Sequence, residues 1–242
     1  MRRSKYFEEI PEFENIADLY SFVVDRYPLI INLKELNKPI LIPTYYLLKY
    51  LINRDDYPDD EISIFSKNPG IKNVIKIFAQ RNKFFIVFLY KSRYYAITPR
   101  SLFIYLVENL FQEKFLYIFD KVLHHARQCF QYNTKITRII TTLLENRSNF
   151  APICRRGKIT RIISAVDILN LYVHYRKNID DLYVFDIKSP LFSLQKSTTY
   201  NEVIDCLKRY SYSIYVVSGK KEYFIDEVSM YETIKEIFTK GI

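Results

Sequence analysis

The chain has 242 residues, and its 36 Lys and Arg outnumber 27 Asp and Glu to give a formal net charge of +9. Hydrophobic residues make up 49% of the sequence, which excludes a disordered chain, because such a chain has too little apolar surface to offset the entropy of ordering. The length allows one large domain or two domains of about 100–150 residues each. Four widely separated glycines exclude a glycine-rich phosphate loop, so any bound phosphate must contact a helix N-terminus or basic side chains.

The cellular location of the protein is predicted from its apolar segments and from the number and spacing of its cysteines. The sequence contains no apolar run of the about 20 residues that a transmembrane helix needs. Its basic N-terminal stretch is not followed by the apolar segment of a signal peptide. The cysteines, Cys129, Cys154 and Cys206, are odd in number and stand at no framework spacing, which favours a reducing cytoplasm. Many Lys, Ile, Tyr and Arg beside few Gln and Met favour a thermophilic source.

One unit is repeated along the chain, with the order strand, helix, strand, strand, helix in its most complete copies. Four copies are expected over residues 1–56, 57–112, 113–177 and 178–242. The two strands after each first helix are joined by a short polar turn. In chain order, these strand pairs are predicted over 29–33 and 38–42, 84–90 and 94–97, 150–154 and 159–164, and 213–217 and 223–225.

Helices precede and follow each strand pair. The first helices are predicted over 16–23 and on apolar faces that begin at Ile71, Ile136 and Val203. Short strands over 129–132 and 191–194 precede the first helices of copies three and four. The second helices open at Pro43, Thr98, Ser164 and Asp226, at spacings of 55, 66 and 62 residues. A period near sixty residues therefore divides the chain into four repeats.

The third copy carries the most specific residues. In NFAPICRRGKITRIISAVDIL, a strand with Pro152 precedes a turn with Gly157, a second strand, and Ser164-x-x-Asp167 at a helix start. This pattern resembles the cystathionine-β-synthase (CBS) domain, and FIVFLYKSRYYAITPRSLFIYL and IYVVSGKKEYFIDEVSMYETI match it in copies two and four. The resemblance implies an α+β fold of four β-α-β-β-α repeats, as two tandem CBS pairs packed in a disc similar to the gamma subunit of AMP-activated protein kinase. It also implies a regulatory, energy-sensing protein that binds AMP, ADP or ATP.

Ser164 and Asp167 have two interpretations. A Ser at the N-cap and an acid three residues later form a capping box, whose polar atoms satisfy backbone N–H groups at the helix start. The resemblance instead implies that Ser164 contacts a phosphate and that Asp167 accepts hydrogen bonds from the ribose hydroxyls. The other openings lack this carboxylate, because Tyr46, Ser101 and Ser229 stand at the position of Asp167. We therefore expect one main nucleotide site, at repeat three.

Other residues are candidates for the same site. Arg161 is the nearest basic residue to the opening, and Arg100, in the corresponding opening of repeat two, could reach a shared central space of the disc. The alternative for each is a solvated surface cation. Walls for the base are expected from the strand and from a cysteine before the first helix: Phe150, Pro152, Ile153 and Cys129. Core packing is the alternative for the apolar ones.

Other functions are less well supported by the sequence. His124, His125, Cys129, Cys154 and His174 match no zinc spacing, so no metal is expected. We expect no catalysis, because there is no general acid–base pair and no nucleophile motif. The positive charge and many tyrosines permit nucleic-acid binding, although the basic residues are dispersed. A ligand-free CBS interaction module is a further alternative. The expected partners are a nucleotide, an unknown regulated protein and a second copy of the chain, with no membrane.

Overall fold

The structure is a computed structural model. It describes residues 5–14, 30–35, 38–43, 48, 62–80, 83–125, 128–146, 148, 150–165, 167–169, 171, 179–187, 193–195, 198–209 and 214–240. None of the helices formed by these residues is long and apolar enough to cross a membrane.

Repeat two has the expected order of elements: β5 (Ile62–Phe65), α2 (Ile71–Gln80), β6 (Phe85–Tyr90), β7 (Arg93–Ile97) and α3 (Pro99–Asn109). β6 pairs parallel with β5 and antiparallel with β7, as a strand–helix–strand–hairpin unit requires. The first four residues of β6 are all buried, and because consecutive residues of a strand point to opposite faces, both faces of the sheet are covered here. The predicted strands and both predicted helices of this repeat are confirmed.

Repeat four repeats this order: β10 (Ser193–Gln195), α7 (Tyr200–Arg209), β11 (Ile214–Ser218), β12 (Lys221–Ile225) and α8 (Glu227–Lys240). β11 pairs parallel with β10 and antiparallel with β12. The hairpin turn contains Gly219 with a φ of 60°, a backbone angle that glycine adopts without steric cost. The hairpin and both helices therefore match the sequence prediction.

Repeat three contains α5 (Ile136–Glu145), followed by the antiparallel strands β8 (Phe150–Arg155) and β9 (Lys158–Ser164). A helix starts directly after Ser164. The strand predicted over 129–132 is reduced to one residue, Phe130, which forms an isolated parallel bridge with Ile153. The element order of the repeat is confirmed, with a shorter first strand than expected.

Repeat one is described in part, by β2 (Glu12–Phe13), β3 (Ile30–Glu35) and β4 (Lys38–Pro43). β3 pairs antiparallel with β4 and parallel with β2. The predicted hairpin is therefore confirmed. The helix predicted over 16–23 lies outside the described residues, and of the helix expected after Pro43 only Leu48 is described, as helical and fully buried.

Several further elements are not part of the repeated order of strands and helices, and the sequence had not indicated them. They are β1 (Glu8–Glu9), η2 (Gln112–Lys114), α4 (Phe115–Val122), η3 (Ile179–Asp181) and η4 (Val184–Asp186). α4 buries four apolar residues, Phe115, Ile118, Phe119 and Val122, at helical spacing. It thereby joins the core that repeats two and four share.

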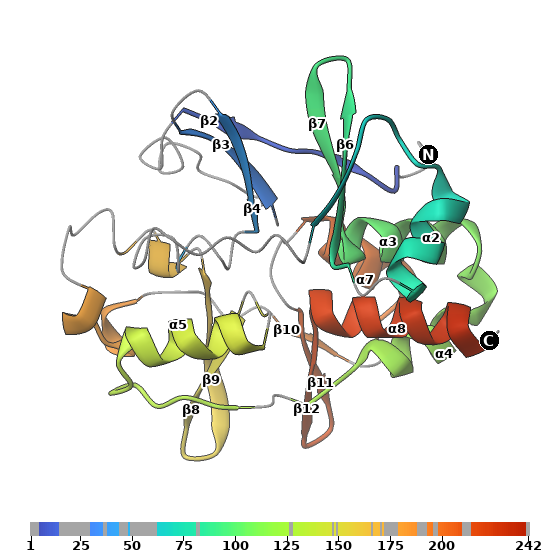
Figure 1. The fold of residues 1–242 in the computed structure, drawn as a ribbon. Helices are drawn as coiled ribbons and strands as arrows, with labels where there is room; N and C mark the ends of the chain where they lie inside the picture. The colour runs from blue at the N-terminus through green and yellow to red at the C-terminus, as the bar shows by residue number, and fades with distance from the viewer. Residues whose placement is uncertain are drawn as a thin grey trace.

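The repeats associate in two different ways. One hydrophobic core joins helices of repeat two, such as α2 and α3, to α7 and α8 of repeat four, and a second core joins repeats one and three. Sheets form the other contacts: Phe150 of β8 stacks on Phe224 of β12, with ring centroids 5.0 Å apart. In Figure 1, the hairpins project above and below a central layer that contains the helices. Tandem repeats three and four thus meet through sheets, and helices pack across the pairs.

Each half of the chain begins with a segment that crosses between its two repeats. Residues 5–13, the first crossing segment, pair with β7 of repeat two through β1 and with β3 of repeat one through β2. Residues 124–125 and 128–130, together called the second crossing segment, pair with Phe224 of repeat four at His124 and with Ile153 of repeat three at Phe130. The two halves are therefore built alike, although their sequences in these segments differ.

Candidate functional site

The opening of repeat three is closed by its own side chains. Oδ2 of Asp167 accepts hydrogen bonds from the backbone N–H and the hydroxyl of Ser164, at 2.7 Å each. The hydroxyl of Ser164 in turn accepts from the backbone N–H of Asp167 at 3.1 Å. The capping interpretation is thus realised. Both cap contacts to the carboxylate involve Oδ2, and the capping box makes no use of Oδ1.

The charge of Asp167 is poorly compensated. Burial raises the pKa of this carboxyl, and the hydrogen bonds from Ser164 act against the shift. A buried acid with a raised pKa commonly marks a functional position, although capping residues can show the same effect. The carboxyl of Asp167 therefore keeps its proton to a higher pH than a solvent-exposed aspartate does.

The opening of repeat four has its carboxylate one helical turn earlier. Oδ1 of Asp226 accepts from the backbone N–H of Ser229 at 2.7 Å, which caps α8. Oδ2 lies 3.3 Å from Nε2 of His124. Burial acts to raise the pKa of Asp226, but the contacts with His124 and Ser229 outweigh it, and the pKa is lowered. This carboxylate is ionised and already paired.

Arg100 forms a buried ion pair. Its guanidinium donates to Oε1 of Glu227 at 2.7 Å, and the two side chains are 6% and 1% exposed. Arg100 lies at the second position of α3 and Glu227 at the first position of α8. The pair therefore joins the helix openings of repeats two and four, 127 residues apart in sequence.

The other predicted cation, Arg161, also has partners within the protein. Its Nη1 donates to the backbone carbonyl of Ile187 at 2.8 Å, and its guanidinium lies 5.1 Å from the ring centroid of Tyr132. These contacts place Arg161, which belongs to β9, beside Tyr132 and beside Ile187, the residue that follows η4. A phosphate at Ser164 would require Arg161 to exchange the carbonyl of Ile187 for the ligand.

A cavity of 540 Å³ lies between repeats three and four. Phe150, Ala151 and Pro152 form one wall, and the opening of α8 with Asp226 and Ser229 forms another. Charged and neutral polar residues complete it, among them Lys121, His124, His125, Gln128, Thr142, Asn146, Glu232, Lys235, Glu236 and Lys240. Lys121 and Lys240 are both paired with Glu236, so the lysines of the cavity are largely balanced by its acids. Ser164 and Asp167 are not among the lining residues.

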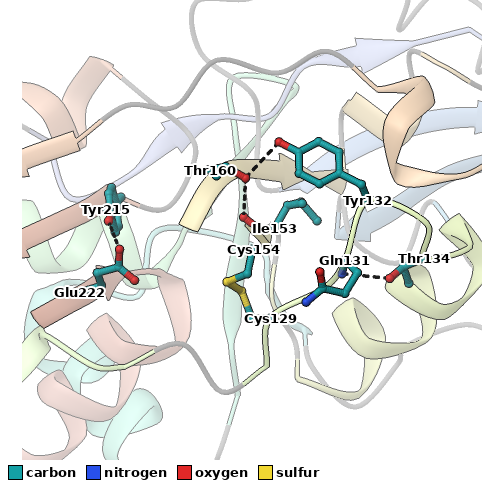
Figure 2. Close-up of a disulfide and its surroundings, with 9 residues drawn as sticks. All are labelled: Cys129, Gln131, Tyr132, Thr134, Ile153, Cys154, Thr160, Tyr215 and Glu222. Atoms are coloured by element: carbon teal, nitrogen blue, oxygen red, sulfur yellow. Dashed lines mark hydrogen bonds between the residues drawn. A yellow bond between two sulfur atoms is a disulfide. The ribbon is translucent and has the colours of Figure 1, made fainter. Parts of the chain in front are cut away.

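The predicted wall residues fall in different places. Phe150 and Pro152 line the cavity, whereas Ile153 is fully buried in the core of repeats one and three. Cys129 is joined to Cys154 in a disulfide, so the expectation of reduced cysteines is wrong for this pair (Figure 2). The Cα atoms are 5.8 Å apart, within the ordinary range for a disulfide. No regular spacing in the sequence indicated this pairing.

Sequence reasoning also missed the role of His124. Its ring lies between the capping carboxylate of Asp226 and the backbone carbonyl of His125, 3.0 Å from Nδ1. A histidine beside an apolar helix carries no local signal for a partner 102 residues away. Among the described residues, no group of three or more His, Cys, Asp or Glu is arranged to hold a metal.

The comparisons with known proteins concern the fold. No family model and no curated protein matches the sequence. A protein from Methanocaldococcus jannaschii, proposed as an archaeal homologue of the gamma subunit of AMP-activated protein kinase, is 12% identical, with a TM-score of 0.62 over 93% of this chain and 95% of that chain. A conserved protein from Pyrococcus horikoshii is 15% identical, with a TM-score of 0.55 over 97% of this chain and 100% of that chain.

These two structures match nearly the whole chain, including both halves and all four repeats. At 12% and 15% identity the likeness is one of fold and says nothing by itself about ligands. This likeness of fold agrees with the order of elements seen in repeats two, three and four of this chain and with the hairpin of repeat one. The chain has the CBS-domain fold, with four repeats in two tandem pairs.

Proposed function

We propose that the protein is a regulatory CBS protein that binds an adenosine nucleotide, AMP, ADP or ATP, at the opening of repeat three. Asp167 accepts hydrogen bonds from the two ribose hydroxyls, and Ser164 and the helix N-terminus bind the phosphate. Phe150 and Pro152, on the strand beside Ser164, supply the apolar surface for the base. The protein itself catalyses no reaction in this proposal.

The observation that supports the proposal most is the state of Asp167. Of the four openings, this one alone has a carboxylate at the third helix position. Burial raises its pKa, and only hydrogen bonds from Ser164 oppose the shift. Asp226, in contrast, is already paired with His124 and Ser229. Hydrogen bonds donated by a ribose would add to those from Ser164 and stabilise the ionised carboxylate of Asp167.

Regulation would follow if the nucleotide preferred one arrangement of the repeats. A ligand shifts an equilibrium only by its difference in affinity between two states. The sheets of repeats three and four are in contact at Phe150 and Phe224, and repeat four contacts repeat two through Glu227 and Arg100. A change at the opening of repeat three therefore has a continuous packed route to the second pair.

The test is calorimetric titration of AMP, ADP and ATP into the wild type and into Asp167→Asn. Loss of charge-assisted hydrogen bonds is worth about 1.5–3 kcal/mol, so affinity should fall by about 10- to 150-fold. The matched control is Glu202→Gln. Glu202 accepts from the N–H and the hydroxyl of Thr199 at 2.9 and 2.8 Å, which is the same capping arrangement at the start of α7.

Glu202→Gln should bind nucleotide as the wild type does, because it removes an equivalent cap away from the opening of repeat three. If Asp167→Asn also binds as the wild type does, Asp167 is a capping residue only. If no adenosine nucleotide binds to the wild type, the proposal is wrong, and a ligand-free interaction module becomes the better interpretation.

A second candidate function is binding to nucleic acid. One observation favours it: Arg155, Arg156 and Lys158, at the tip of the β8–β9 hairpin, surround an open hollow together with Thr160. None of these three cations forms an ion pair with a described residue. Binding of an oligonucleotide should weaken steeply as salt is added, because phosphate contacts release counterions. Absence of binding at low salt would exclude this function.

A further inference from the structure

The disulfide between Cys129 and Cys154 fastens the second crossing segment to repeat three. Figure 2 shows it beside Ile153 and Thr160, where the segment runs along β8. The backbone N–H of Phe130 donates to the carbonyl of Pro152 at 3.0 Å, and the N–H of Cys154 donates to the carbonyl of Phe130 at 2.8 Å. The disulfide therefore reinforces the contact between the second crossing segment and β8. This contact also includes the two hydrogen bonds and the buried side chain of Phe130.

The corresponding segment in the first half needs no such bond. Residues 5–13 pair with β7 at two positions and with β3 at two positions, and the N–H of Ile10 donates to the carbonyl of Tyr94 at 2.9 Å. In the described part of the second crossing segment, ladder pairing is limited to single bridges at His124 and Phe130. The covalent bond thus stands where backbone pairing is weaker.

The fastened segment is also a wall of the cavity between repeats three and four. Gln128 and Phe130, on either side of Cys129, line the cavity, as do His124 and His125 from the same segment. Pro152, two residues before Cys154, lines it from β8. The disulfide therefore joins the backbone of one wall to the backbone of the adjacent wall.

Reductants can reach this bond from one side. Cys129 is exposed, whereas Cys154 is 8% exposed and faces β9. The third cysteine, Cys206, is buried in the separate core of repeats two and four. In thiol–disulfide exchange, the attacking thiolate must reach one sulfur along the axis of the S–S bond. Cys129 offers that access without unfolding of the repeat.

We propose that Cys129 and Cys154 form a reversible redox site that sets the rigidity of the cavity wall. A thiolate of a dithiol reductant attacks Sγ of Cys129, the S–S bond breaks, and Cys154 leaves as a thiolate and takes up a proton. The second thiol of the reductant then displaces Cys129, which yields two protein thiols and the oxidised dithiol. The two hydrogen bonds between Phe130 and β8 remain, so reduction loosens the wall and leaves the repeat folded.

The experiment compares oxidised and dithiothreitol-treated protein by thiol counting and by amide hydrogen exchange. Titration in denaturant should find one thiol before reduction and three after it. Exchange at the amides of Phe130 and Cys154 should become at least about tenfold faster on reduction, because local opening no longer requires the disulfide-linked backbones to move together. The amides of Ile10 and Asn32, which bond the first crossing segment, serve as the internal control and should not change.

Two variants make the result decisive. Cys154→Ala should show fast exchange at Phe130 with or without dithiothreitol, and Cys206→Ala should respond to the reductant as the wild type does. Three thiols before reduction, or protection of Phe130 that is the same in both redox states, would overturn the proposal. So would a disulfide that dithiothreitol reduces only after denaturant is added. No nucleotide is present, so this result is separate from that for Asp167.

Discussion

The openings of repeats three and four use the same residue types in opposite places. In repeat three, Ser164 is the cap and Asp167 stands one turn into the helix, whereas in repeat four Asp226 is the cap and Ser229 stands one turn in. Burial acts to raise the pKa of Asp226, but the contacts with His124 and Ser229 outweigh it, so the pKa is lowered. Asp167 has bonds from Ser164 alone against burial, and its pKa is raised.

The difference shows that groups outside the cap, His124 above all, contribute to the direction in which the pKa of the capping acid is shifted. His124 comes from the second crossing segment, which passes beside β12 of repeat four. At the first position of α8, Glu227 adds a second buried charge, which Arg100 of repeat two balances. The opening of repeat four is thus paired with groups from the second crossing segment and from repeat two.

The largest expected effect comes from the buried ion pair at the opening of repeat four. Glu227→Gln leaves Arg100 without this carboxylate in a buried position, so the free energy of unfolding should fall by about 3–5 kcal/mol. Urea unfolding measures the loss. The double variant Arg100→Met, Glu227→Leu should recover most of it, because both charges of the pair are removed together. A single variant as stable as the wild type would show that water reaches the pair.

The next effect separates the two carboxylates. Asp226→Ala removes the cap of α8 and the partner of His124, and should cost about 2 kcal/mol. Asp167→Ala removes only the cap contacts with Ser164, so the free energy of unfolding should fall by about 1 kcal/mol or less. Both values come from urea unfolding at neutral pH. Equal losses would mean that His124 contributes nothing to the opening of repeat four.

The two acids should also differ in the sign of their pH dependence. The pKa of Asp226 is lowered on folding, so its contribution to stability is present above its unfolded pKa of about 3.8 and is lost as the pH falls through the folded pKa. The pKa of Asp167 is raised, so stability decreases as the pH rises from about 3.8 through the folded pKa. Unfolding of wild type, Asp226→Asn and Asp167→Asn across this window measures both slopes. The same sign for both acids would contradict the assigned environments.

The smallest effect is expected at the far end of α8. Lys121 and Lys240 contact Oε1 of Glu236 at 2.7 and 3.2 Å, on a solvated surface. Exposed pairs contribute little, since solvent and salt screen them. Glu236→Gln should therefore leave the urea midpoint unchanged within error. A large loss would mean that α4, which carries Lys121, depends on this contact to stay docked.

Local features of the fold could be predicted because their causes are local. Short apolar runs separated by a polar turn specify the hairpins, such as β6–β7, and caps such as Thr98 mark helix starts. The hydroxyl of Thr98 accepts from the N–H of Ser101 at 3.0 Å, as expected for such an opening. Within the site, Ser164, Asp167, Phe150 and Pro152 carried a local signal. The position of the cavity did not, because its two walls belong to different repeats.

The sequence by itself determined the period near sixty residues, the four openings and the carboxylate that distinguishes Asp167 from the others. The openings depend on residue types within one repeat, and the period depends on the spacing between copies along the chain. Tertiary structure decided the partners of charges and thiols: Arg100 with Glu227, His124 with Asp226, and Cys129 with Cys154. Their physical reason is packing across repeats, since burial and the crossing segments bring together groups from 25 to 127 residues apart.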